Sequence, residues 1–266
     1  MIEVRPLRDD EIDVYVAVRT RVHPDNPMPR DVVVDDRKRP DHLDLLASLD
    51  GEPAGVASTS IFGGAPNGDL AFLTIRVPRE HRRRGVGTAL HRRASEHARG
   101  LGKGRFYCVI RSDDADSSAY YAARGYVEVG RMRDAVLELD EVDAPQVDFE
   151  IVPLTPELER AVYEVALEAD ADIPSDEPHE SGSFEQWRER TLGSSLALRD
   201  LSFVALEGGR ALGYALLGRH DAETAMNWMT GIARSARGRG IALALKQHQA
   251  AAAREAGWKR LRTQND

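Results

Sequence analysis

Two segments rich in arginine and glycine have the residue types and spacing needed to hold an anion. The first contains Arg82, Gly85 and Gly87, and the second contains Arg237 and Gly240. A turn that leads into a helix exposes unpaired N–H groups and the positive end of the helix dipole, and glycine lets phosphate oxygens approach these amides. Flanking guanidinium groups add charge-assisted hydrogen bonds. Neither segment is a Walker A loop or a G-x-G-x-x-G fingerprint, so the pattern indicates another phosphate-bearing ligand.

A strand before each turn and a helix after it are needed to place the amides. Residues 71–77 carry apolar side chains at every second position, which predicts a strand, and Pro78 ends the run. Residues 86–101 carry apolar side chains at i, i+3 and i+4, which predicts a helix. The same order recurs at 226–232 and 241–256.

The sequence repeats itself at a constant offset. Arg82 matches Arg237 (237 − 82 = 155), and the same offset relates Gly102 to Gly257 without a gap. Two shorter matches lie upstream: 3–7 with 150–154, and 51–55 with 209–213. A series that stays in phase predicts a duplicated domain.

The repeat predicts an N-terminal domain at 1–140, a linker at 141–149 and a C-terminal domain at 150–266. The linker is acidic, contains proline and has no apolar periodicity. By the offset, the second copy stops where the first reaches Arg111 and lacks its last helix and strands. Either the sequence is truncated, or the second copy takes its missing edge from elsewhere.

Composition narrows the class of protein. The 266 residues carry a formal net charge of -8 at pH 7, which disfavours nucleic acid and membrane surfaces because both are polyanions. No apolar run approaches the roughly 18 residues of a membrane span, and no signal sequence is apparent, so cytoplasmic residence is expected. The single cysteine, Cys108, is expected to be a small buried residue. The histidines show no ligand spacing, and no metal site is predicted: His23, His42, His179 and His220.

Both turns resemble the signature of the GNAT N-acetyltransferases, which reads Gln or Arg, x, x, Gly, x, Gly or Ala. The matching residues are Arg82, Gly85 and Gly87 in the first copy, and Arg237, Gly240 and Ala242 in the second. The resemblance covers nearly all of the first half and most of the second. It implies an α/β fold with two tandem GNAT-like units, each a mixed, mainly antiparallel twisted sheet flanked by helices. Coenzyme A would enter where the central strands part.

The resemblance also implies a set of residues that bind acetyl-CoA as co-substrate. In this family the amides of the turn hold the pyrophosphate, and main-chain groups of the preceding strand pair with the acetyl and pantetheine parts. The implied set is Ile75, Val77, Arg82, Arg83, Arg84, Gly85, Val86, Gly87 and Thr88 in the first unit, and Thr230, Ile232, Arg237, Gly238, Arg239, Gly240, Ile241 and Ala242 in the second.

Residues 119–126 are similar to the late helix of the family. Tyr121 stands four residues before Gly125, the position from which a GNAT tyrosine protonates the departing thiolate. A phenol stays protonated at neutral pH and can donate to a developing thiolate. The alternative is that Tyr121 only packs in the helix. No tyrosine can be assigned this role in the second copy.

The general base is not assigned. The family often uses a glutamate before the turn, but the matching positions hold Ala71 and Met226. Asp69, Glu223, another acidic residue or an ordered water chain could accept the proton of the amine.

The expected function is acetyl-CoA-dependent N-acetylation of a primary amine by direct attack, with a small-molecule or peptide amine as acceptor and a homodimer as a possible assembly. Alternatively, one or both halves are non-catalytic modules that bind CoA or serve a structural role. A nucleic-acid binder that uses the arginine turn is disfavoured by the acidity. The acceptor would be selected by the segments 22–41 and 170–201, whereas Trp187 is expected to pack in a core.

Overall fold

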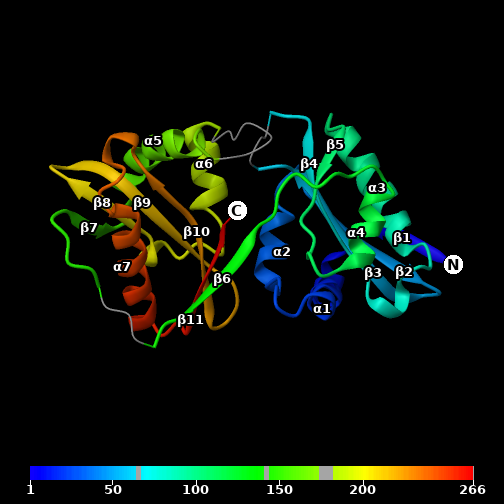
Figure 1. Cartoon of the computed structure of the whole chain (residues 1–266). Coiled ribbons are helices and arrows are strands. Elements are labelled where there is room, and N and C mark those ends of the chain that lie inside the picture. The colour runs from blue at the N-terminus through cyan, green and yellow to red at the C-terminus, as the bar shows by residue number, and fades with distance from the viewer. Residues whose placement is uncertain (64–66, 141–143, 174–181, 266) are drawn as a thin grey trace. The chain divides into compact units, whose positions relative to one another are not determined.

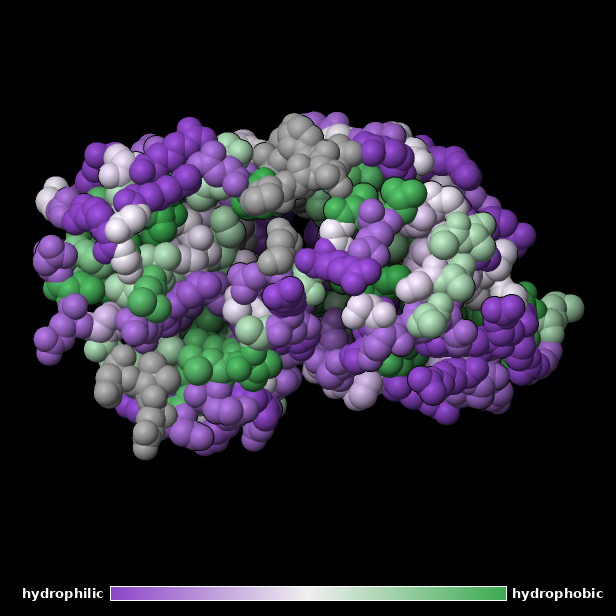
Figure 2. Space-filling view, in the orientation of Figure 1, coloured by the Kyte–Doolittle hydropathy of each residue, from purple (hydrophilic) through white to green (hydrophobic). Residues whose placement is uncertain are grey.

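The computed structural model describes residues 1–63, 67–140, 144–173 and 182–265 (Figure 1). The chain divides into two compact units, Met1–Val129 and Gly130–Asp266. Three parts of the sequence-based predictions lie outside the described residues: linker positions 141–143, positions 174–181 of the predicted acceptor segment with His179 among them, and the terminal Asp266. On the face shown in Figure 2, hydrophilic side chains cover most of the surface. No helix in the described ranges has the length and apolar character needed to span a bilayer.

The first unit is built on a five-stranded sheet in the order β1-β2-β3-β4-β5. Its strands are β1 (Ile2–Pro6), β2 (Leu43–Leu49), β3 (Glu52–Ile61), β4 (Leu70–Arg76) and β5 (Arg105–Tyr107). Neighbouring strands are antiparallel except β4 and β5, which run parallel. The parallel pairing covers only Leu70 to Phe72, so β4 continues beyond the end of β5.

Helices cover both faces of this sheet. They are α1 (Ile12–Val22), α2 (Arg30–Asp36), α3 (Val86–Gly100) and α4 (Ala115–Ala122). Successive residues of a strand point to opposite faces, and on β2 the buried Leu46 packs with α1 and α2 while Leu45 packs with α3. Tyr121 of α4 belongs to the cluster on the α3 side.

The second unit has a six-stranded sheet in the order β6-β11-β10-β9-β8-β7. Its strands are β6 (Arg133–Glu138), β7 (Glu150–Pro153), β8 (Phe203–Glu207), β9 (Arg210–Arg219), β10 (Thr224–Ile232) and β11 (Arg260–Asn265). Again all neighbours are antiparallel except one pair, β10 and β11, which is parallel. Short 3-10 helices occur in both units, at Asp9–Glu11, Arg79–His81, Pro156–Leu158, Arg199–Leu201 and Arg234–Ala236.

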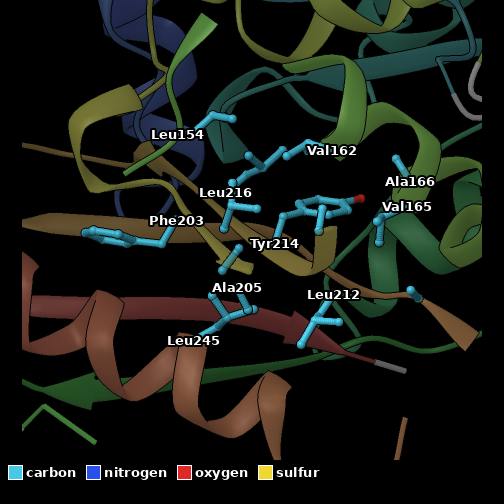
Figure 3. Packing of buried hydrophobic residues seen from close by; sticks show 14 of the residues in the cluster. Leu154, Val162, Val165, Ala166, Phe203, Ala205, Leu212, Tyr214, Leu216 and Leu245 are labelled. Atoms are coloured by element: carbon cyan, nitrogen blue, oxygen red, sulfur yellow. The ribbon is translucent and has the colours of Figure 1, made fainter. Parts of the chain in front are cut away.

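The core of the second unit lies between its sheet and the helices α5 (Glu159–Asp170), α6 (Phe184–Thr191) and α7 (Ile241–Glu255). Figure 3 shows Tyr214 and Leu216 of β9 directed toward Val162 of α5, with Ala205 of β8 next to Leu245 of α7. Trp187 of α6 is also buried in this cluster, which confirms the expected packing role.

The edge strand β6 lies in the second unit, before the domain boundary that the sequence predicts. The sequence predicts that its residues belong to the first domain, 1–140, but β6 pairs antiparallel with β11 over its whole length (Figure 1). The two compact units accordingly divide between Val129 and Gly130. The second sheet therefore takes its outer strand from the segment that precedes it in the chain. A repeat offset could not show this, because strand pairing depends on which edge is available and not on sequence order.

The predicted elements around both turns are confirmed. β4 and β10 match the expected strands, and α3 and α7 match the expected helices within two residues at each end. The strand β5 ends at Tyr107 and leaves Cys108 beyond it. Cys108 is partly exposed, with no disulfide, and burial raises the pKa of its thiol to about 11.

Glu159 is a buried carboxylate that holds two arginines in the second unit. It is 3% exposed and forms ion pairs with Arg188 of α6 and with Arg199. Burial alone would raise its pKa, but the hydrogen bonds from Arg199 and Arg188 outweigh burial, so the pKa lies below 4.5. The stabilisation is therefore fully present above about pH 4.5 and is lost as the pH falls through the lowered pKa.

We expect Glu159→Gln to destabilise the protein by about 2 to 3 kcal/mol at pH 7, since both arginines lose their carboxylate. Thermal unfolding at pH 7 and at pH 4 measures the effect. The difference in melting temperature between the variant and the parent protein should be smaller at pH 4. Glu157→Gln, on the exposed start of the same region, is the control and should change stability by less than about 0.5 kcal/mol. Equal melting temperatures for the Glu159 variant and the parent at pH 7 would contradict the assignment.

Candidate functional site

The first turn is shaped by two residues in the left-handed backbone region. Gly85 has φ 88 and is the N-cap of α3, and Arg83 has φ 60. The turn delivers the chain directly into a helix of 15 residues. The first amides of that helix have no carbonyl partner one turn earlier, so they are available to an anion together with the helix dipole.

A cavity of about 410 Å³ lies against this turn, in the range typical of small-molecule sites. It is bounded by the end of β4, the segment that follows β5, the turn and α4. The cavity thus opens where β4 and β5 cease to pair. Eight of the sequence-predicted residues line it: Ile75, Val77, Arg82, Arg83, Gly85, Gly87, Thr88 and Tyr121.

Two predicted residues of the first turn do not line the cavity. Val86 is 1% exposed and packs in the hydrophobic core against Leu90 and its neighbours. Arg84 is exposed and lies 3.6 Å from the carboxylate of Asp50, in the turn between β2 and β3. The Val86 side chain therefore anchors the turn in the core, the Arg84 side chain lies on the surface, and neither lines the cavity.

Arg82 links the turn to the end of β4 and to the start of α4. Its Nε donates to the carbonyl of Val77 at 3.2 Å, and its Nη2 donates to Asp114 at 3.2 Å. Asp114 caps α4 by accepting from the backbone N–H of Ser117. The guanidinium also lies 3.5 Å from Asp116. The charge of Arg82 is thus neutralised, and the side chain fixes α4 against the end of β4.

Arg83 differs from the other two arginines of the turn. It is exposed at the cavity, and within the described chain it has no ion pair or hydrogen bond. A non-glycine residue in the left-handed region costs free energy, and the second copy has Gly238 at the matching position (83 + 155 = 238) with φ 78. The uncompensated charge and the strained backbone single out Arg83 as the turn cation available to a phosphate.

Gly87 allows a tyrosine to approach the turn. A Cβ at this position would lie 3.3 Å from the ring of Tyr120, whose hydroxyl donates to the carbonyl of Gly87 at 2.8 Å. Arg124 stacks on the same ring at 3.6 Å and donates to Thr88 Oγ1 at 2.7 Å. Sequence analysis missed Tyr120 and Arg124, although their i, i+4 spacing on a helix could have suggested a pair.

Tyr121 lies in the wall of the cavity. It is 6% exposed, and its ring packs edge-on against Tyr120 and Tyr126 at centroid distances of 5.1 and 4.9 Å. Within the described chain its hydroxyl has no hydrogen-bond partner. Burial raises the pKa of this phenol, and the nearby charge of Arg76 acts in the opposite direction. The hydroxyl therefore carries a proton at neutral pH and has a cation near it.

The cavity is also lined by His23, Arg76 and Arg111. Burial lowers the pKa of His23, and the charge of Arg76 lowers it further, so its imidazole is neutral at physiological pH and can accept a proton. Sequence analysis assigned no role to His23, because nothing in the local pattern places it beside the cavity. Its position at the end of α1 does so.

Neither acidic residue named as a candidate base lies at the cavity. Asp69 accepts from the backbone N–H of Gly104 at the far end of β4, and Glu223 pairs with Arg260 in the second unit. The carboxylates that do line the cavity, Asp114 and Asp116, are paired with Arg82. Among the described residues no cluster of three or more metal-ligating side chains is present.

The second turn repeats the geometry of the first with its charges neutralised. Gly238 and Gly240 have φ 78 and 76, and Gly240 is the N-cap of α7. Arg237 donates to the carbonyl of Ile232 at 3.3 Å, as Arg82 does to Val77, and pairs with Asp172 at 2.7 Å. Arg239 pairs with Glu207 at 2.7 Å.

The remaining predicted residues of the second unit have structural contacts. Thr230 donates to the side chain of Asn227 at 3.2 Å, and Ile232 packs in the main core cluster. Ile241 is 2% exposed, and Ala242 is partly buried in the first turn of α7. On β10 a bulge between Asn227 and Met229 interrupts the pairing with β9. The turn amides are therefore present, but no side-chain cation of this turn is uncompensated in the described part of the unit.

Comparisons with known proteins find the same family in both units. The model of the acetyltransferase (GNAT) family matches residues 7–126 and 160–266. A GCN5-related N-acetyltransferase from Sphaerobacter thermophilus is 20% identical, with a TM-score of 0.79 over 100% of this chain and 86% of that one. A tandem GNAT protein from the clavulanic acid biosynthesis pathway is also 20% identical, with a TM-score of 0.77 over 100% and 90%. These likenesses show the fold. No curated protein matches the chain in sequence.

Proposed function

The chain belongs to the GNAT acetyltransferase family, with one unit of the fold in each half, and from this premise we propose that its first unit transfers an acetyl group from acetyl-CoA to a primary amine. The observation that carries the proposal is the cavity where β4 and β5 cease to pair. It joins the amides at the start of α3, the uncompensated Arg83 and the protonated hydroxyl of Tyr121 in one place. The amides and Arg83 suit the diphosphate of the coenzyme, and the hydroxyl of Tyr121 can protonate the leaving thiolate.

In the proposed reaction the main chain and Arg83 hold the coenzyme, and the amine enters from the side of α1. His23 accepts a proton from the amine, directly or through water, because its imidazole is neutral and faces the cavity. The nitrogen attacks the thioester carbonyl and the C–S bond breaks. Tyr121 donates its proton to the sulfur, since burial keeps its hydroxyl protonated at neutral pH and the residue lines the cavity.

For the second unit we propose a structural role without catalysis. Its turn has a glycine where the first unit has Arg83, and both of its arginines are paired. The pairing of the turn arginines with carboxylates also argues against a nucleic-acid interface at either turn, because Arg83 alone is left as an available cation among them.

We expect one molecule of acetyl-CoA to bind per chain. Isothermal titration calorimetry with acetyl-CoA measures the stoichiometry, and an assay of thiol release with a panel of primary amines measures transfer. The matched variants are Gly85→Val and Gly240→Val, since both glycines have positive φ and cap the helix after the turn. The first should abolish binding and the second should leave it intact. Two sites per chain would refute the role proposed for the second unit, and no binding would refute the transferase proposal.

A further inference from the structure

Arg76 is a cation inside the cavity for which the described chain provides no carboxylate. It is the last residue of β4 and it lines the cavity. Among the described residues its guanidinium donates only to the carbonyl of Ile75, at 3.2 Å. Burial lowers the pKa of Arg76 to about 10, and the charge of the neighbouring Arg19 lowers it too, but the group remains charged at neutral pH. A partly buried cation without a counter-ion is unfavourable unless a ligand supplies one.

The carboxylates around the cavity are already engaged elsewhere. Asp114 is held by Arg82 and by the first turn of α4. Asp25 and Asp113 are both paired with Arg111. Among the described residues no carboxylate is left to balance Arg76, which favours a bound molecule as the source of the negative charge.

The position of Arg76 separates this anion from the coenzyme phosphates. The coenzyme phosphates are proposed to lie at the turn, where Arg83, Thr88 and Arg124 line the cavity. Arg76 instead is near Tyr121, whose pKa its charge influences, and near His23, which follows α1. The second unit has Gly231 at the matching position (76 + 155 = 231), so the cation is a feature of the first unit alone.

Building on the function proposed above, we infer that Arg76 binds a carboxylate of the amine acceptor, so that the substrate class is amino acids or other amines that carry a carboxylate close to the reacting nitrogen. A guanidinium can hold a carboxylate with two parallel hydrogen bonds and thus fixes its orientation. The amine of such an acceptor lies within a few bonds of the carboxylate, which directs it toward the thioester near Tyr121 and the imidazole of His23.

The test compares each common L-amino acid with its carboxamide as acceptor, with acetyl-CoA as donor, by kcat/KM. We expect the parent protein to prefer the carboxylate form of its best acceptor by about tenfold or more. Arg76→Gln should remove that preference while acetyl-CoA affinity stays within about twofold, and Arg76→Lys should restore part of it. Arg111→Gln is the control, and the preference should persist in it because Arg111 is already paired with Asp25 and Asp113.

A second pair of measurements tests carboxylate binding without turnover. Calorimetric titration of the CoA-saturated protein with N-acetylglycine and with N-acetylglycinamide should show tighter binding of the carboxylate, and Arg76→Gln should remove the difference. If carboxamide acceptors react faster with succinyl-CoA than with acetyl-CoA, and only when Arg76 is present, the carboxylate belongs to the acyl group and the acceptor assignment is overturned. A carboxylate preference that is absent in the parent, or intact in Arg76→Gln, overturns the inference itself. Failure of the proposed function would appear instead as absence of acetyl-CoA binding.

Discussion

Tyr121→Phe is expected to lower kcat for acetyl transfer by about 10² to 10⁴-fold, which is the contribution of a positioned general acid. The affinity for acetyl-CoA should stay within about twofold. The reason is that the hydroxyl faces the cavity and has no hydrogen-bond partner among the described residues, while the ring packs between Tyr120 and Tyr126 and remains in the variant. Steady-state kinetics with a saturating amine and calorimetry with acetyl-CoA measure the two quantities.

The matched control removes a neighbouring hydroxyl. Tyr126 packs on Tyr121, but its hydroxyl is 3.0 Å from the Nε2 atom of His91, and it does not line the cavity. Tyr126→Phe should therefore change kcat by less than about threefold. Equal kcat values for Tyr121→Phe and the parent protein would show that Tyr121 only packs, which is the alternative that the sequence left open.

Arg83→Gln is expected to weaken acetyl-CoA binding by about tenfold or more, since it removes a charge-assisted hydrogen bond to a phosphate. The charge is uncompensated in the described chain and is held at the cavity by a residue with φ 60. Isothermal titration calorimetry at two salt concentrations measures the effect, and the affinity of the parent protein should fall more steeply with salt than that of the variant.

Arg84→Gln makes the same change of charge one residue later. Arg84 faces Asp50 and does not line the cavity, so its loss should alter the affinity by less than about threefold. If both variants weaken binding equally, the effect is a general one of net charge, and Arg83 has no special role. If neither does, the backbone amides of α3 hold the pyrophosphate without help from a side chain.

The sequence alone was sufficient for the local architecture of both turns. The period of two in 71–77, the helical period in 86–101 and their recurrence 155 residues later (237 − 82 = 155) predicted β4, α3, β10 and α7. These patterns work because a strand and a helix expose a buried face at different sequence intervals. The placement of Gly85 before α3 follows from the same physics, since glycine adopts positive φ at little cost.

Sequence could not distinguish among three neighbouring arginines. Arg82, Arg83 and Arg84 look equivalent in the motif, yet the first is tied to Asp114, the third faces Asp50, and the second faces the cavity with no partner among the described residues. The partners lie 32 residues after Arg82 and 34 residues before Arg84 (114 − 82 = 32; 84 − 50 = 34). Only the folded chain brings them together.

What the amino-acid sequence determined by itself is the family, the duplicated α/β units and the backbone of each turn, because these depend on short-range periodicity and on glycine. Tertiary structure alone decided that β6 completes the second sheet and that His23 and Arg76 line the same cavity as Tyr121. It also decided which arginine of the first turn has no ion-pair partner among the described residues. These outcomes depend on edge pairing and on charge neutralisation between residues that are far apart in the chain, and no local pattern records either of them.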